Sequence, residues 1–132
     1  MSLWFRIVRK KVRRRTRVKN TKNKIALSLH KEDAKAFTLS RLEYWNQFYN
    51  FKYGTVKIKS QTTRWGSCSS KGNLNINYRI VLLPEHLADY LIVHELCHLE
   101  EFNHSQKFWN LVSKTIPDFV QRRSELKKIR LD

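Results

Sequence analysis

The spacing of hydrophobic residues predicts a helix over residues 30–50. Apolar side chains recur there at steps of three and four positions, which places them on one face of an α-helix. They are Ala34, Phe37, Leu42, Trp45 and Phe48 or Tyr49. We expect this helix to end near Tyr53 and Gly54.

After this helix the period of the pattern changes to two. Val56 and Ile58 alternate with lysines, as in a strand with one buried face. A second strand is predicted over residues 63–68, and a third begins at Leu74 after the turn sequence of residues 69–73. Three short strands in succession predict a small antiparallel sheet.

Pro84 and Glu85 predict the start of another helix. Proline fits the first helical position, and a carboxylate is favoured at the positive end of the helix dipole. The apolar pattern continues to about Phe102, where Asn103 can adopt the left-handed conformation that ends helices.

Two shorter helices complete the chain. Ser105 can cap a helix from about residue 106 to 116, and Pro117 precedes a last amphipathic helix that carries Phe119 and Leu126. The predicted fold class is therefore α+β, with a small sheet packed on a central helix and further helices around it.

The length and charge of the chain suggest one domain with a basic extension. The 132 residues fit a single domain, and 41% hydrophobic residues suffice for a core. The net charge is +16, and residues 9–24 hold ten basic side chains and no acidic one. We therefore divide the chain into a basic N-terminal arm, residues 1–29, and a domain, residues 30–132. Such an arm is either a solvated segment or a contact for nucleic acid.

The cysteine content and the hydropathy of the chain indicate the cellular compartment in which we expect the protein. Cys68 and Cys97 are the only cysteines, which is too few for a disulfide framework and typical of a reducing compartment. No stretch approaches the ~20 apolar residues that span a bilayer. We expect a cytoplasmic monomer that does not bind membranes.

Residues 94–98 carry a motif typical of metal-dependent hydrolysis. On a helix His94 and His98 lie only ~40° apart, one turn above the other, so both imidazoles can reach one ion. Glu95 flanks the pair, where a general base for a zinc-bound water should stand. His104 supplies a third ligand and leaves the fourth position of the metal open. The predicted cofactor is Zn²⁺.

The chain resembles the YgjP-like metallopeptidases, which are related to the SprT and WLM proteases. Some of those proteases act on proteins crosslinked to DNA. The resemblance covers about residues 30–125 and rests on two blocks of sequence. The first block contains TRWGSCS at 63–69, GNLN at 72–75 and YR at 78–79. The second block contains VHELCH at 93–98, NHS at 103–105 and FW at 108–109. It implies a compact zincin-like domain in which His94, His98 and His104 bind zinc and Glu95 is the catalytic base.

Other interpretations of the motif remain open. The histidines could simply pack on an amphipathic helix. A metzincin would need a glycine midway between the second and third histidines and a methionine turn, but position 101 is Glu101 and the only methionine is Met1. A gluzincin would take its third ligand from a downstream acid such as Glu125. Cys97 could also bind metal, although a buried helical cysteine more often acts as a small hydrophobe.

The sequence thus predicts a zinc metallopeptidase that cleaves a polypeptide substrate with a metal-bound water activated by Glu95. Arg64 and Trp65 are candidate substrate-binding residues at a strand edge, although core packing is the commoner role for tryptophan. The alternative is a nucleic-acid-associated protein that uses residues 9–24, with the peptidase acting on DNA-bound proteins. A structural zinc domain without activity is disfavoured, because structural sites close the fourth position.

Overall fold

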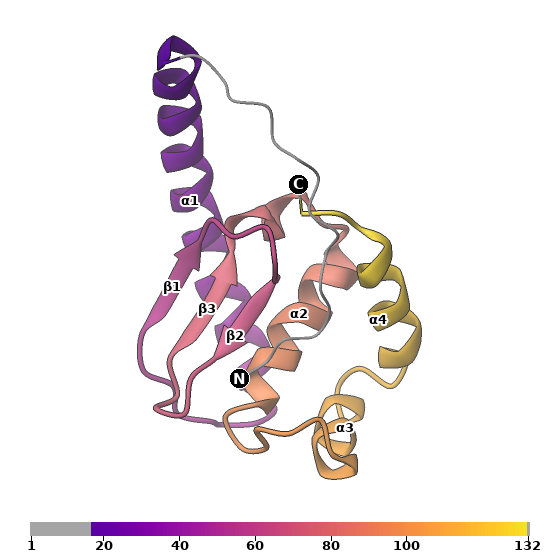
Figure 1. Ribbon diagram of the computed structural model, residues 1–132. Coiled ribbons are helices and arrows are strands. Elements are labelled where there is room, and N and C mark those ends of the chain that lie inside the picture. The colour runs from indigo at the N-terminus through magenta and orange to yellow at the C-terminus, as the bar shows by residue number, and fades with distance from the viewer. Residues whose placement is uncertain (1–16, 132) are drawn as a thin grey trace.

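The computed structural model describes residues 17–131, with side chains from residue 30 onward. The described residues form four α-helices, one 3₁₀ helix and a small sheet, arranged as Figure 1 shows. The elements are α1 (Arg17–Asn46), β1 (Val56–Lys59), β2 (Gly66–Cys68), β3 (Leu74–Asn77), the 3₁₀ helix η1 (Tyr78–Leu82), α2 (Glu85–Cys97), α3 (Gln106–Ser113) and α4 (Phe119–Lys128). The predicted α+β class is confirmed.

The three strands form one mixed sheet in the order β1-β3-β2. Strands β2 and β3 are antiparallel, as predicted, but β1 and β3 are parallel, which corrects the prediction of an entirely antiparallel sheet. The reason is that residues 60–65 carry the chain across the sheet, so that β3 returns between the first two strands. Gly72 closes the β2–β3 turn with a φ of 80°, a conformation that glycine adopts without steric cost.

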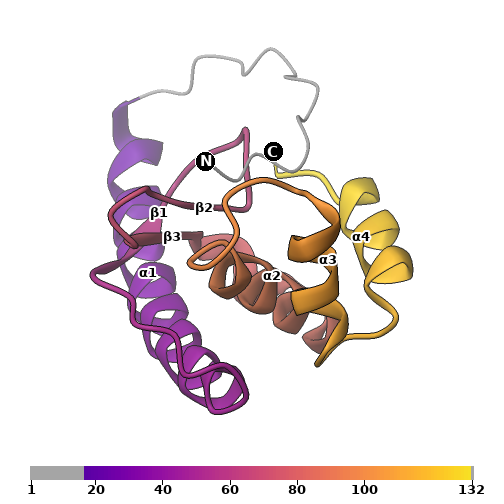
Figure 2. The same ribbon diagram turned by 90° about the horizontal axis from the view of Figure 1, so that it is seen from below.

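Helix α2 lies at the centre of the molecule. It packs against α1, β2, α3 and α4. Figures 1 and 2 show it between α1 with the sheet on one side and α3 with α4 on the other. All of its residues from Leu87 to Cys97 are buried, because a helix covered on every side has no solvent face. The motif residues are therefore carried by the most enclosed element of the fold.

Helix α1 begins earlier and ends earlier than predicted. It starts at Arg17 rather than at residue 30 and so crosses the predicted boundary between arm and domain. At its other end the Asn46 side chain bonds both the backbone N–H and the carbonyl of Phe51. Asn50 then turns the chain with a φ of 57°. Residues 9–16 of the basic run lie outside the described residues, and the division into arm and domain stays a prediction.

Helix α2 ends at Cys97, five residues before the predicted end at Phe102. Asn103 is not left-handed, since Asn50 is the one non-glycine residue with positive φ in the described part of the chain. The helix instead ends through turns, in which the backbone N–H of Glu101 bonds the Cys97 carbonyl. The predicted cap of the next helix is confirmed, because the Ser105 side chain accepts a hydrogen bond from the backbone N–H at position 108. The early end leaves a loop that can fold back toward α2.

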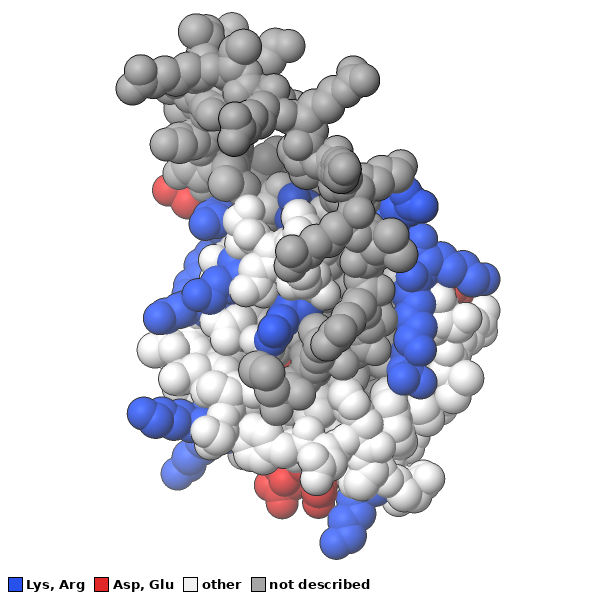
Figure 3. Space-filling model, viewed as in Figure 1, with Lys and Arg blue, Asp and Glu red and all other residues white. Residues whose placement is uncertain are grey.

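Basic side chains dominate two flanks of the surface. Figure 3 shows Lys and Arg along the flank on which α4 lies and on the opposite flank near β1, with smaller groups of Asp and Glu. The basic residues in the sequence of α4 are Arg122, Arg123, Lys127 and Lys128. None of the described helices combines the length and the apolar character that crossing a bilayer requires.

Candidate metal and catalytic site

Three histidine side chains converge at the end of α2. His94 and His98 lie one turn apart on or beside the last turn of this helix, and His104 lies in the loop before α3. The Nε2 atoms are 2.9 Å apart for His94 and His98, 3.0 Å for His98 and His104, and 3.1 Å for His94 and His104. Among the described residues these three form the group that could hold a metal ion. The structure thus brings all three predicted ligands together.

Lowered pKa values keep these imidazoles neutral. His94 and His98 are closed to solvent, whereas His104 is exposed. Burial lowers the pKa of His98 to about 4 and lowers the pKa of His94 well below its ordinary value, with His98 and His104 adding to the effect on His94. Partial burial, and then the positive charge of Arg123, lower the pKa of His104. Neutral rings expose the nitrogen lone pairs that bind metals.

Contacts behind two of the rings orient them. The Nδ1 atom of His98 lies 2.9 Å from the backbone carbonyl oxygen of Glu101, which can only accept a hydrogen bond. The proton of His98 is therefore on Nδ1, and its Nε2 atom carries a lone pair. The Tyr90 hydroxyl lies 3.4 Å from Nδ1 of His94, and either atom can be the donor in this contact. Contacts of this kind fix ring orientation and raise ligand basicity in metal sites.

The three nitrogens fit a zinc ion. Zn–N bonds of about 2.0–2.1 Å separate the nitrogens of a tetrahedral site by about 3.3 Å. The observed separations of 2.9–3.1 Å are close to that value. Nitrogen lone pairs that face one another at this distance repel unless a proton or a cation lies between them. Three imidazoles also leave one coordination position open, which is typical of catalytic rather than structural sites.

Glu95 follows His94 on α2 and lies where this helix meets β2. The residue is fully buried. A Cβ atom added to Gly66 would stand 3.2 Å from both Cγ and Oε1 of Glu95, so the glycine allows the strand to approach the carboxylate. Cys68, on the same strand, has its pKa raised to about 11, first by burial and then by the charge of Glu95. Strand β2 therefore packs closely against the Glu95 side chain.

Two aromatic residues of α3 pack against the histidines. The Phe108 ring stacks on His98, with ring centres 4.4 Å apart and planes at 19°, and the Trp109 ring stacks on His104 at 5.7 Å and 26°. Ser105, which caps the start of α3, follows directly after His104. Because His104 is an exposed loop residue, the cap and the Trp109 ring restrict the positions that its side chain can take.

The remaining candidates from the sequence lie in different places. Trp65 is only 3% exposed and belongs to the core, and Arg64 is half-buried just before β2. Their role in substrate binding stays a prediction. Glu125, the candidate gluzincin ligand, bonds His86 at 2.8 Å and is outside the histidine group, which favours His104 as third ligand. Cys97 is also buried outside that group.

Arg123 on α4 is a site residue that the sequence did not single out. Its guanidinium carbon lies 5.2 Å from the centre of the Trp109 ring. After burial, its positive charge is a further cause of the lowered pKa of His94 and of His104, and it opposes the rise that burial produces in the pKa of Tyr90. Only the packing of α4 against α2 brings position 123 to this site, so no local sequence pattern could have indicated it.

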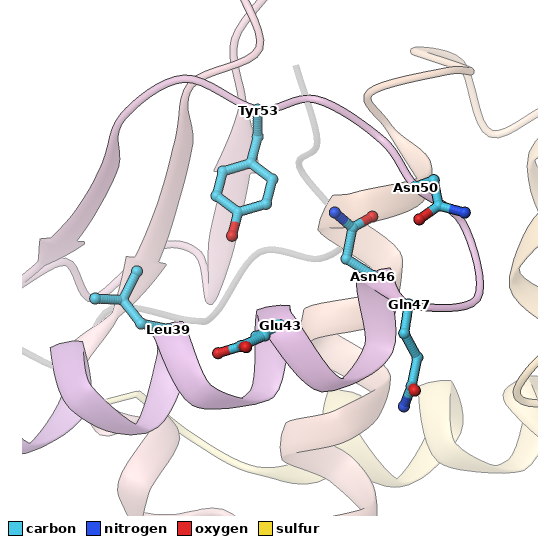
Figure 4. A pocket seen from close by; sticks show the side chains of 6 residues that line it. All are labelled: Leu39, Glu43, Asn46, Gln47, Asn50 and Tyr53. Carbon is cyan, nitrogen blue, oxygen red and sulfur yellow. The ribbon is translucent and has the colours of Figure 1, made fainter.

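A separate hollow lies between the end of α1 and the loop that leads to β1 (Figure 4). Its lining is largely polar and includes none of the histidines. The residues that line it are Leu39, Glu43, Asn46, Gln47, Asn50 and Tyr53. This hollow is therefore distinct from the metal site.

The fold and the site together define a metallopeptidase: a buried helix carries two histidines and a glutamate, and a third histidine folds back from the next loop. The chain belongs to the YgjP-like family, since the model of the YgjP-like metallopeptidase domain matches residues 4–129. A comparison with curated protein sequences gave no match.

Two solved structures are similar to the chain. The metallopeptidase zymogen abylysin of Pyrococcus abyssi is 25% identical, with 67% of this chain and 87% of that chain covered and a TM-score of 0.58. The metallopeptidase zymogen jannalysin of Methanocaldococcus jannaschii is 26% identical, with 73% and 97% covered and a TM-score of 0.53. Both similarities agree with the class of protein that the site defines.

Proposed function

We propose that this protein is a zinc-dependent peptidase in which His94, His98 and His104 bind the metal and Glu95 is the general base. The observation that carries the proposal is the convergence of three Nε2 atoms within 3.1 Å of one another, at the end of a helix that also carries the buried carboxyl group of Glu95. Membership in a metallopeptidase family supports it. A zinc ion held there supplies Lewis-acid chemistry, which polarises a peptide carbonyl and makes a water molecule more acidic.

The chain's own residues perform the proton transfers and the positioning. Glu95 takes a proton from the attacking water on its carboxylate and delivers it to the amine that leaves. The Glu101 carbonyl holds His98 in the tautomer that presents Nε2. Phe108 and Trp109 cover the faces of His98 and His104, which excludes water from that side of the site.

The test compares Glu95→Gln with Glu125→Gln. Glu125 is a partly exposed carboxylate that bonds His86, so it controls for the loss of a charge outside the site. Zinc per chain is measured by elemental analysis, and peptide cleavage by mass spectrometry. Glu95→Gln should keep the metal and lose about 10²-fold or more of kcat, because general acid–base catalysis contributes about 10²–10⁴-fold. Unchanged cleavage by zinc-loaded Glu95→Gln protein would contradict the proposed role.

The alternative role in nucleic-acid binding stays a prediction. The basic flank near α4 in Figure 3 and the net charge of +16 favour contact with a polyanion. If residues 9–24 bind DNA, deleting them should abolish binding, and affinity should fall steeply as salt rises. Cytoplasmic location and a monomeric state also stay predictions.

A further inference from the structure

Arg123 is a positive charge at the edge of the proposed metal site, and it has no acidic partner within the described part of the chain. It is half-buried on α4, and no carboxylate of the described residues forms an ion pair with it. The acids nearest to it in α4 and its cap are engaged elsewhere, since Asp118 pairs with Arg122 and Glu125 pairs with His86. A partly desolvated guanidinium is stabilised by an incoming anion more than an exposed one would be.

The contacts of Arg123 place it near the reacting groups. Its guanidinium carbon is 5.2 Å from the centre of the Trp109 ring, and the centre of that ring is 5.7 Å from the centre of the His104 ring. These two distances limit the separation between the guanidinium and His104 to about 11 Å, which is about the length of three extended residues. A polypeptide bound at the metal site can therefore bring a nearby side chain to Arg123.

The geometry also favours recognition by a planar, bidentate contact. A guanidinium that lies over an aromatic ring keeps N–H groups at its edge for an acceptor, and the spacing of these groups matches the two oxygens of a carboxylate. The charge is felt at the site itself, because it contributes, after burial, to the lowered pKa of His94 and His104. The net charge of +16 would further attract acidic chains over a distance.

We propose that Arg123 binds an acidic side chain of the substrate, so that the peptidase prefers polypeptides with Asp or Glu within about three residues of the scissile bond. This inference rests on the proposed function, and it adds the substrate class. Arg122 is the matched control, because it is the neighbouring arginine on α4 but already bonds Asp118 and the backbone carbonyl of His86.

The experiment begins with zinc-loaded wild-type protein and a mixed peptide library, with products identified by mass spectrometry. At each position within three residues of the cleaved bond, peptides that differ only by Asp or Asn are then compared. We expect one position at which Asp raises kcat/KM by about tenfold, mainly through KM, as for the loss of a buried charge contact. Arg123→Met should remove this difference, Arg123→Glu should reverse it in favour of Lys, and Arg122→Met should keep it. Zinc content and thermal stability are measured for each variant.

Failure of this inference can be separated from failure of the proposed function. Absence of any cleavage by the wild-type protein would count against the peptidase. Binding of the same peptides to zinc-loaded Glu95→Gln protein, followed by fluorescence anisotropy, tests Arg123 without turnover. Equal binding and cleavage of Asp and Asn peptides would overturn the inference, as would a preference that survives in Arg123→Met. If Arg123→Met weakens binding of a DNA oligonucleotide, and the Asp and Asn peptides are bound and cleaved equally, then Arg123 contacts phosphate and the inference is wrong.

Discussion

Replacing Gly66 with alanine should reduce catalysis without removing the metal. The added Cβ would lie 3.1 Å from the carbonyl oxygen of Asn75 and 3.2 Å from Cγ and Oε1 of Glu95. These contacts are too close, so one neighbour must move by a few tenths of an ångström. The Asn75 carbonyl is fixed by the β2–β3 pairing, whereas Glu95 is a side chain, so we expect Glu95 to move. A misplacement of ~1 Å at a reacting group can cost about 10²-fold, so a smaller shift should lower kcat about tenfold.

The assay measures kcat, zinc per chain and the free energy of unfolding for Gly66→Ala and for Gly54→Ala. Overpacking at Gly66 should also cost about 1–3 kcal/mol of stability. A Cβ at Gly54 meets only the Asn73 side chain and nearby backbone, and that side chain accepts a hydrogen bond from Thr55. The control should therefore lose about 1 kcal/mol and keep its kcat. If Gly66→Ala retains full kcat at full zinc loading, the argument that Gly66 positions Glu95 is wrong.

Three further predictions concern the histidines. His104→Ala should lose zinc in competition with a chelator while His86→Ala keeps it, and equal retention by both would exclude His104 as a ligand. In the metal-free protein the pKa of His98 is about 4, against 6.5 in the unfolded chain, so the unfolded state binds more protons between these two pH values. The free energy of unfolding should therefore fall by about 3 kcal/mol as the pH drops from 6.5 to 4. A melting temperature that stays constant over that range would refute this prediction. Ser105→Ala removes the cap that bonds the N–H of Phe108, so it should cost about 1 kcal/mol and speed zinc release; an unchanged release rate would show that the cap does not hold the loop.

The part of the site that lies within one helix could be predicted from the sequence. The spacing of His94 and His98 depends only on the 3.6-residue turn, and the structure brings their Nε2 atoms to 2.9 Å. The sequence also predicted that His104 would lie near His94 and His98, but the structural reason given for it was wrong. The loop forms because α2 stops at Cys97 and continues as turns, and not because Asn103 is left-handed.

The parts that depend on long-range packing could not be predicted. The alternation in β1 and β3 indicates strands, but it does not say which strands are neighbours, so the parallel pairing was missed. The contact of Gly66 with Glu95 and the approach of Arg123 to Trp109 each join residues on different elements. A single sequence carries no local signal for such pairs.

In the proposed metal site, two ligands lie in a rigid part of the fold and the third lies in a loop that needs support. This difference determines where substitutions can change the affinity for zinc. His94 and His98 are buried on or beside a helix that neighbours cover on every side, so their geometry exists before metal binds. His104 is exposed in a loop, and ordering a backbone residue costs about 1–2 kcal/mol. The cap at Ser105 and the stacking of Trp109 offset that cost in the folded protein. Changes in α3, and in α4 behind Trp109, should therefore alter zinc release more than conservative changes elsewhere in the core.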